Sequence, residues 1–208
     1  MWYIVTTPWW LRMMFPKNLL WKIPSKEKVL YLTFDDGPHP EVTTFVLDEL
    51  KKYNAKATFF CIGKNVEENP DIYKRILIEG HRTGNHTHNH LNGFKTKDDI
   101  WLNNVKEAAK WIDSDLMRPP YGKINYFQAQ VLQQSKPPFK VIMWSVISAD
   151  FDTKKTPQQC YNYVKKKGQP GSIIVFHDSE KAFPNMKYAL TETLKFFSSE
   201  GYRFEAIK

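Results

Sequence analysis

Short apolar runs alternate with amphipathic segments from about residue 28 to the end of the chain. The run "VLYLTF" is rich in strand-forming residues and stops at the turn signal "DDGP", whereas "EVTTFVLDELKKYN" carries apolar residues at helical spacing. The pattern predicts strands at 29–34, 56–62, 81–86, 116–118, 140–147, 172–177 and 203–208, and helices at 41–54, 70–80, 97–114, 125–134, 157–167 and 184–199. Strand-then-helix alternation without a flexible linker indicates an α/β domain whose mostly parallel sheet is closed or nearly closed into a barrel.

Polar clusters follow most of these predicted strands. The segments that come after successive strands are "DDG", "NHTHNH", "RPPYG", "SADFD" and "HD". In a βα barrel the carboxyl ends of the strands meet at one rim, and active sites lie there. We therefore expect these five segments, distant in sequence, to form one site.

Two of the clusters contain metal-binding side chains. Asp35 and Asp36 are adjacent carboxylates at a strand end, where the alternative is an ordinary turn and helix cap. His86 and His90 are four positions apart, a spacing that lets two imidazoles share one face of a helical turn and bind one divalent cation. The alternative is a polar loop that happens to be rich in histidine. Two histidines with one carboxylate would leave coordination positions open, as in catalytic sites.

Arg118 and His177 each have two interpretations. Arg118 in "RPPYG" is either a surface charge before a polyproline turn or a rim residue. His177 follows the apolar run "SIIVF" and is either a buried structural histidine or a general acid. Their positions after predicted strands favour the rim in both cases.

Taken together, the segments resemble a known family. "TFDDG", "HTHNH", "RPPYG", "SADF" and "IIVFHD" are similar, in content and order, to the motifs of the polysaccharide deacetylases, carbohydrate esterase family 4. The resemblance covers about residues 28–208. It implies a distorted (β/α)7 barrel and a hydrolase that removes N-acetyl groups from glycans that contain N-acetylglucosamine, such as chitooligosaccharides or peptidoglycan, giving a free amine and acetate.

The resemblance also assigns roles to individual residues. The implied catalytic group is Asp35 as base, Arg118 holding ionised Asp35, the Tyr121 backbone N–H in the oxyanion hole, His177 as general acid and Asp150 as its partner. The implied metal ligands are Asp36, His86 and His90, which would hold one divalent ion, with zinc as the default and cobalt, manganese or nickel compatible with the same donors. Val175 and Phe151 would line a pocket for the acetyl methyl group.

The fourth motif departs from the family pattern Asp-x-x-Asp-Trp. Ile147 replaces the first Asp and Phe151 replaces the Trp. We expect activity with an altered pocket wall. Two other functions stay open: an amidase acting on a small cyclic amide, and a non-catalytic glycan-binding module whose metal is structural.

The first 27 residues form an aromatic-rich extension, and residues 28–208 the catalytic domain. The extension has no basic start and is interrupted by Pro8, which argues against a cleavable signal peptide. It either packs on the domain or makes peripheral membrane contact through residues 2–21. The side chains suited to a membrane surface are Trp9, Trp10, Trp21, Arg12, Lys17 and Lys22. The location is unknown from the sequence, which is compatible with a cytoplasmic or a membrane-associated protein.

Composition narrows the remaining possibilities. The chain has 208 residues, 42% hydrophobic, which is enough for one domain with a core and argues against disorder. The net charge is +8, but no basic run exceeds "VKKKGQ", so nucleic-acid binding is not expected. Cys61 lies in the apolar run "ATFFCIG" and is expected to be a buried thiol, with a disulfide to Cys160 as the alternative.

Overall fold

A curled sheet of parallel strands forms the centre of the protein in a computed structural model, which describes residues 5–8, 10, 13, 15–16 and 19–208. The strands are β1 (Val29–Asp35), β2 (Thr58–Cys61), β3 (Arg82–Asn85), β4 (Leu116–Met117), β5 (Lys140–Val141), β6 (Val146–Ile147), β7 (Ile173–His177) and β8 (Arg203–Phe204). Their order is β5-β4-β3-β2-β1-β7-β6, and β8 pairs with β1. This single α/β domain confirms the predicted barrel in an open, distorted form.

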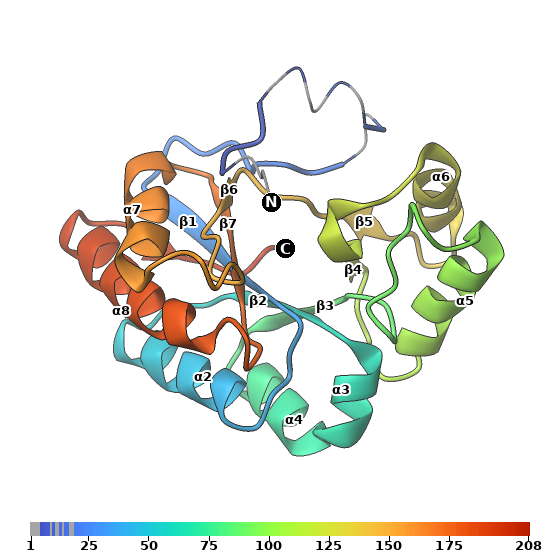
Figure 1. Cartoon of the computed structure of the whole chain (residues 1–208), viewed down its shortest axis with the longest axis horizontal. Coiled ribbons are helices and arrows are strands. Elements are labelled where there is room, and N and C mark those ends of the chain that lie inside the picture. Colours follow the sequence, from blue (N-terminus) through green and yellow to red (C-terminus); the bar gives the residue numbers. More distant parts are fainter. Residues whose placement is uncertain (1–4, 9, 11–12, 14, 17–18) are drawn as a thin grey trace.

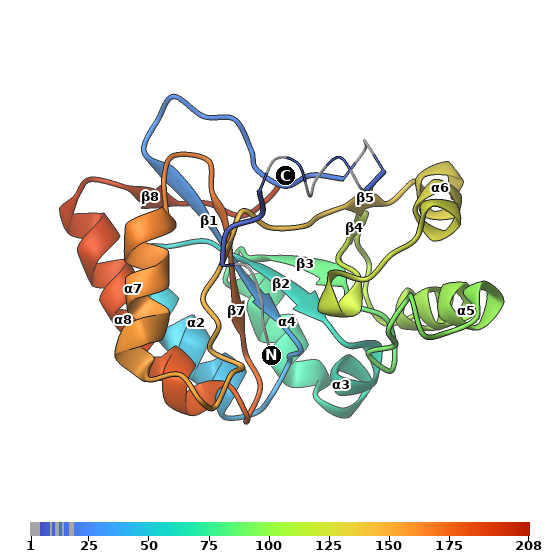
Figure 2. The same ribbon diagram turned by 45° about the horizontal axis from the view of Figure 1, so that its top comes forward.

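Helices cover the outside of the curled sheet (Figures 1 and 2). They are α2 (Val42–Lys52), α3 (Gly63–Glu68), α4 (Pro70–Ile78), α5 (Asp98–Ala108), the short 3-10 helix η1 (Pro120–Gly122), α6 (Tyr126–Gln134), α7 (Pro157–Lys167) and α8 (Phe183–Ser199). The helix α3 was not predicted, because its six residues carry little apolar periodicity.

The central strands β1 and β7 are buried on both faces. Leu32 and Phe34 are fully buried, and the Phe34 ring lies between those of Phe59 and Phe176, with centroids 5.0 and 6.0 Å away. Burial of both faces is the reason that these strands are continuous apolar runs in the sequence. Cys61 is buried and its thiol is free, as is that of Cys160.

The predicted strand at 140–147 is wrong as a single element, since it divides into β5 and β6 at opposite edges of the sheet. Between them the carbonyls of Ile142 and Met143 accept hydrogen bonds from the Arg118 guanidinium, at 3.2 and 2.9 Å. A buried side chain thus replaces the strand partner for these backbone groups, and the apolar run of the sequence does not reveal this.

The segment before β1 contacts both of those edges. Leu20 donates to Val141 and accepts from Met143, at 2.9 and 2.8 Å, beside β5. Thr6 forms an isolated antiparallel bridge with Val146 of β6. The segment therefore covers backbone groups that the sheet leaves unpaired at β5 and β6.

The proposed membrane anchors fall into two groups. Trp9, Arg12 and Lys17 lie outside the described residues. Trp21 is 9% exposed and belongs to a buried cluster, whereas Trp10 is 49% exposed. In the part of the chain that the structure describes, every helix is too short or too polar to cross a bilayer.

We expect Trp21→Ala to lower the free energy of unfolding by about 3–5 kcal/mol, because it removes a large buried side chain. Urea unfolding followed by circular dichroism measures the change. Trp10→Ala is the matched control, and as an exposed substitution it should change stability by no more than about 0.5 kcal/mol. Equal effects of the two substitutions would contradict the packing of Trp21 in the core.

Candidate active site

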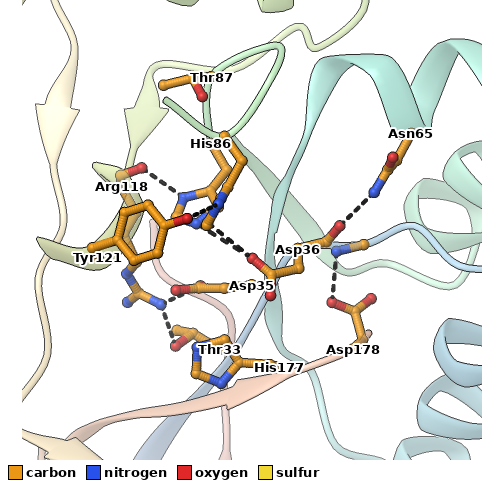
Figure 3. Close-up of polar contacts among 12 residues, drawn as sticks. Thr33, Asp35, Asp36, Asn65, His86, Thr87, Arg118, Tyr121, His177 and Asp178 are labelled. Carbon is orange, nitrogen blue, oxygen red and sulfur yellow. Dashed lines mark hydrogen bonds and ion pairs between the residues drawn. The ribbon is translucent and has the colours of Figure 1, made fainter. Parts of the chain in front are cut away.

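A cleft of about 570 Å³ opens at the carboxyl ends of the strands. Its lining includes Asp35, Asp36, His86, His90, Tyr121 and His177. These residues come from four of the polar segments that the sequence placed at strand ends. Figure 3 shows how most of them point toward one another.

Three candidate metal ligands converge within this cleft. Asp36, His86 and His90 each provide one possible ligand atom, and these three atoms lie within 4.8 Å of one another. Asp36 Oδ1 is 3.2 Å from His90 Nε2 and 3.8 Å from His86 Nε2. The prediction that His86 and His90 share a helical turn is wrong, because both lie on the loop after β3. His90 there has a φ of +55°.

The Nδ1 atoms of both histidines interact with other groups of the protein. His86 Nδ1 is 2.7 Å from the Arg118 carbonyl, to which it donates, and His90 Nδ1 is 3.1 Å from the Tyr121 hydroxyl. This leaves Nε2 of each ring facing Asp36. Metal-binding histidines are usually oriented by such hydrogen bonds on the other nitrogen.

The protonation states of this group also suit a divalent cation. Burial lowers the pKa of His86 to about 4, so its ring is neutral and can donate an electron pair. Burial would raise the pKa of Asp36, but the hydrogen bond with His90 and the charges of His177 and His86 outweigh it, and the pKa lies below its usual value. Asp36 Oδ1 is buried and faces the Nε2 atoms of His90 and His86, at 3.2 and 3.8 Å. An anionic oxygen so placed fits a metal ion.

Neighbouring amides hold the loops that carry the ligands. Asn65 donates to the Asp36 carbonyl at 2.7 Å. Asn104 of α5 accepts from the backbone N–H groups of His88 and Asn89, at 3.0 and 2.9 Å. The His88 ring points away from the cluster, and its Nε2 lies 3.9 Å from Glu67.

Asp35 forms a buried ion pair beside the metal cluster. Its Oδ1 accepts from Arg118 Nη1 at 2.7 Å, and both residues are at most 4% exposed. Arg118 also donates to Thr33 Oγ1 at 2.7 Å, and its guanidinium carbon lies 4.1 Å from the centroid of the Phe60 ring. Arg118 is therefore a buried group, not a surface charge, and it fixes the position of the Asp35 carboxylate.

His177 lies at the end of β7, in register with Asp35 on β1. Its Nδ1 is 2.7 Å from Asp150 Oδ1, and Asp150 Oδ2 accepts from the His177 backbone N–H at 2.8 Å. Burial by itself would lower the pKa of His177, but the charge and hydrogen bond of Asp150, with Asp36 and Asp35, raise it to about 9. The ring is thus a cation at neutral pH and can donate a proton.

The apolar part of the cleft includes Phe151, Val175 and Ile147. The Phe151 ring packs edge-on against His177, with centroids 5.1 Å apart. Both positions that depart from the family pattern in the fourth motif, Ile147 and Phe151, therefore line the cleft.

Several contributing residues received no role from the sequence. Thr33 connects Arg118 to the Ile174 carbonyl, to which it donates at 2.8 Å. Asp178 accepts from the Gly37 N–H at 3.0 Å and so fixes the turn after Asp36. Thr33 and Asp178 lie inside the quoted motifs "TFDDG" and "IIVFHD", so their adjacency to the assigned residues was the available signal.

The chain is similar in sequence to known deacetylases. The family model described as polysaccharide deacetylase matches residues 22–136. A curated peptidoglycan-N-acetylglucosamine deacetylase of Bacillus cereus is 35% identical over 193 residues, which is 90% of each chain. A peptidoglycan-N-acetylmuramic acid deacetylase of Bacillus subtilis is 34% identical over 88% of this chain and 71% of its own. Two further matching deacetylases are longer, and this chain spans 58% and 40% of their lengths.

Among solved structures, one similar protein is a peptidoglycan N-acetylglucosamine deacetylase in complex with 4-naphthalen-1-yl-N-oxidanyl-benzamide. It superimposes with a TM-score of 0.86 at 31% identity, over 97% of this chain and 95% of the other.

Proposed function

Because this chain belongs to the polysaccharide deacetylase family, carbohydrate esterase family 4, we propose that it removes N-acetyl groups from the glycan strands of peptidoglycan. The products are a free amino sugar and acetate. The observation that supports this most directly is the meeting of the Asp36, His86 and His90 ligand atoms in a cleft that also contains Asp35 and His177. Metal dependence is a property of the family.

Asp36, His86 and His90 would hold one divalent cation, for which zinc is the first candidate because two imidazoles and a carboxylate suit it. Cobalt, manganese or nickel would fit the same donors. When bound, such an ion polarises the acetyl carbonyl and lowers the pKa of water.

Asp35 acts in this proposal as the general base and takes a proton from the attacking water. Arg118 holds its carboxylate in position, because it donates to Oδ1 from a buried position. The Tyr121 backbone N–H contributes to stabilising the oxyanion, a type of contact worth about 3–4 kcal/mol in other hydrolases.

His177 acts as the general acid. It gives a proton to the sugar nitrogen as the carbon–nitrogen bond breaks, so that the amine leaves in neutral form. Asp150 is a positioning residue, since both of its carboxylate oxygens are hydrogen-bonded to His177. Water supplies the oxygen of acetate, so atoms and charges balance without a further reactant.

Phe151, Val175 and Ile147 are proposed to surround the acetyl methyl group. An isoleucine in place of the family's first Asp in the fourth motif makes this wall more apolar. The intact Asp35–Arg118 and His177–Asp150 pairs argue against a non-catalytic module, because a structural metal site has no use for them.

Acetate release from a panel of substrates tests the proposal. Peptidoglycan fragments, chitooligosaccharides, acetylxylan and a cyclic imide are incubated with the protein. We expect release from peptidoglycan fragments. Ring opening of the cyclic imide without acetate release from any glycan would establish the amidase alternative.

Chelation is expected to abolish acetate release, and added divalent metal to restore it, because the ligand cluster is partly exposed to the cleft. Metal content and activity are measured on the same samples, from protein that has never contacted a nickel resin. His86→Ala, which removes a buried ligand, should remain metal-free at metal concentrations that restore the native protein. Full activity of the metal-free protein would contradict the proposal.

A further inference from the structure

The rim of the cleft offers a second, chemically different site. We propose that Lys123 and Lys181 bind carboxylates of the glycan substrate, next to the sugar that is deacetylated. This inference rests on the proposed function, and it specifies that the preferred substrate is an acidic rather than a neutral glycan.

The two lysines belong to different sides of the same cleft. Both are among its lining residues, and both are exposed. Lys123 directly follows η1, and Lys181 lies in the connection between β7 and α8. Figure 1 shows these two connections on different sides of the strand ends, and both lysines line the one cleft.

Neither ammonium group is engaged by an acidic side chain in the described part of the protein. The Lys123 ammonium lies 5.3 Å from the centroid of the Phe94 ring, an interaction that leaves its N–H donors available. Glu180 neighbours Lys181 in sequence but does not line the cleft. A carboxylate that approaches either side of the cleft would therefore meet a cation that no acidic side chain engages.

The anionic side chains that line the cleft each have a cationic partner or a proposed metal ion. Asp35 is neutralised by Arg118 at 2.7 Å, and Asp36 is the candidate metal ligand. With a divalent ion in place, the cleft as a whole is cationic. Its field attracts anionic glycans.

Aromatic side chains in the same cleft account for the uncharged part of the substrate. Phe15, Trp144 and Tyr121 all line it, and Tyr121 is 60% exposed. Aromatic faces pack against the C–H faces of sugar rings, while the lysines discriminate by charge. The segment before β1 supplies Phe15, so it contributes to the substrate site as well as to the sheet edges.

Two sources could supply the carboxylate in peptidoglycan: the lactyl group of a muramic acid residue, or the acidic groups of its peptide. Four substrates separate them. They are glycan strands with free lactyl carboxylates, the same strands with these carboxylates converted to primary amides, peptide-bearing strands, and chitooligosaccharides. The kcat/KM for acetate release and the Kd from calorimetry are measured for each.

The variants are Lys123→Gln, Lys181→Gln and the double substitution. Lys51→Gln is the matched control, because Lys51 is an exposed residue of the last turn of α2, does not line the cleft, and carries the same charge. We expect each cleft variant to lower kcat/KM for a carboxylate-bearing glycan by about three- to tenfold, between the effect of an exposed ion pair and that of a hydrogen bond to a charged group. The amidated glycan should be affected less than twofold, and the control should change neither.

Equal losses on the free and amidated glycans, or no loss on either, would overturn the subsite, as would an equal effect of Lys51→Gln. A preference for lactyl carboxylates or for peptide-bearing strands would each support it and identify the source. If no glycan releases acetate but the Kd values show the expected preference, the proposed function fails and the subsite stands.

Discussion

Asp35→Asn is expected to lower kcat for acetate release by about 10²–10⁴-fold while the protein keeps its divalent metal. Asparagine occupies the same volume but cannot accept the proton of the attacking water, and general-base catalysis contributes an effect of this size. The metal ligands Asp36, His86 and His90 are unchanged. Steady-state kinetics and metal content on the same preparation measure both quantities.

The neighbouring substitution Asp36→Asn is the matched control, since it makes the same chemical change one residue away. It should release the metal, because it weakens the carboxylate ligand, and lose activity for that reason. Full turnover in Asp35→Asn would contradict the assignment of Asp35 as the base. Loss of metal in both variants would contradict the proposal that Asp36 is a metal ligand and Asp35 is not.

Asp35→Asn has a further consequence for stability. Arg118 is fully buried, and removal of the Asp35 charge leaves its guanidinium without an anionic partner. Loss of one partner of a buried ion pair typically costs about 3–5 kcal/mol. Urea unfolding should therefore show a destabilised but folded variant, so kinetics are measured below its unfolding transition.

Asp150→Asn is expected to move the alkaline limb of the pH–rate profile downward by about 1–3 pH units. His177 must be protonated to act as the acid, so in the native protein kcat/KM falls as the pH rises through the His177 pKa. Asp150 is the main group that raises this pKa to about 9. Without its charge, the effect of burial dominates and His177 loses its proton at lower pH. A bound cation opposes the contribution of Asp36, so the native limb lies at or below about pH 9.

The profile of kcat/KM between pH 5 and 10 measures this shift. Asp152→Asn removes a charge two positions away that is not among the groups shifting the pKa of His177, and it should leave the limb in place. An unchanged limb in Asp150→Asn would show that another group titrates there. At pH 9 the Asp150 variant should retain only a small part of the native activity, because its His177 is then almost entirely deprotonated.

Much of the fold and of the candidate site could be predicted from the sequence. Runs such as "VLYLTF" and "SIIVFH" are almost continuously apolar, which is typical of strands that are buried on both faces. In the structure they form β1 and β7. Because the carboxyl ends of parallel strands share one rim, the polar segments after them had to meet. Asp36, His86 and His90 are together for this reason, although 54 positions separate Asp36 from His90.

Other features depended on contacts that no local pattern encodes. The apolar run at 140–147 looks uniform, yet Arg118 binds the Ile142 and Met143 carbonyls and the run divides between two sheet edges. Likewise, the sequence assigned Tyr121 only a backbone role, whereas its hydroxyl contacts His90. In both cases the partner is distant in sequence and is chosen by burial, so it becomes visible only when the sheet has formed.

The sequence by itself determined most of the elements, the rim and the identities of the chemical groups on it, because hydrophobic periodicity and residue type are local properties. Only the tertiary structure decided that the segment before β1 covers the β5 and β6 edges, and that Lys123 and Lys181 line the same cleft as the metal ligands. These outcomes depend on which surfaces come together when the chain is folded. The physical reason is that the pairing of exposed backbone edges and the surroundings of a flexible charged side chain are fixed by non-local packing.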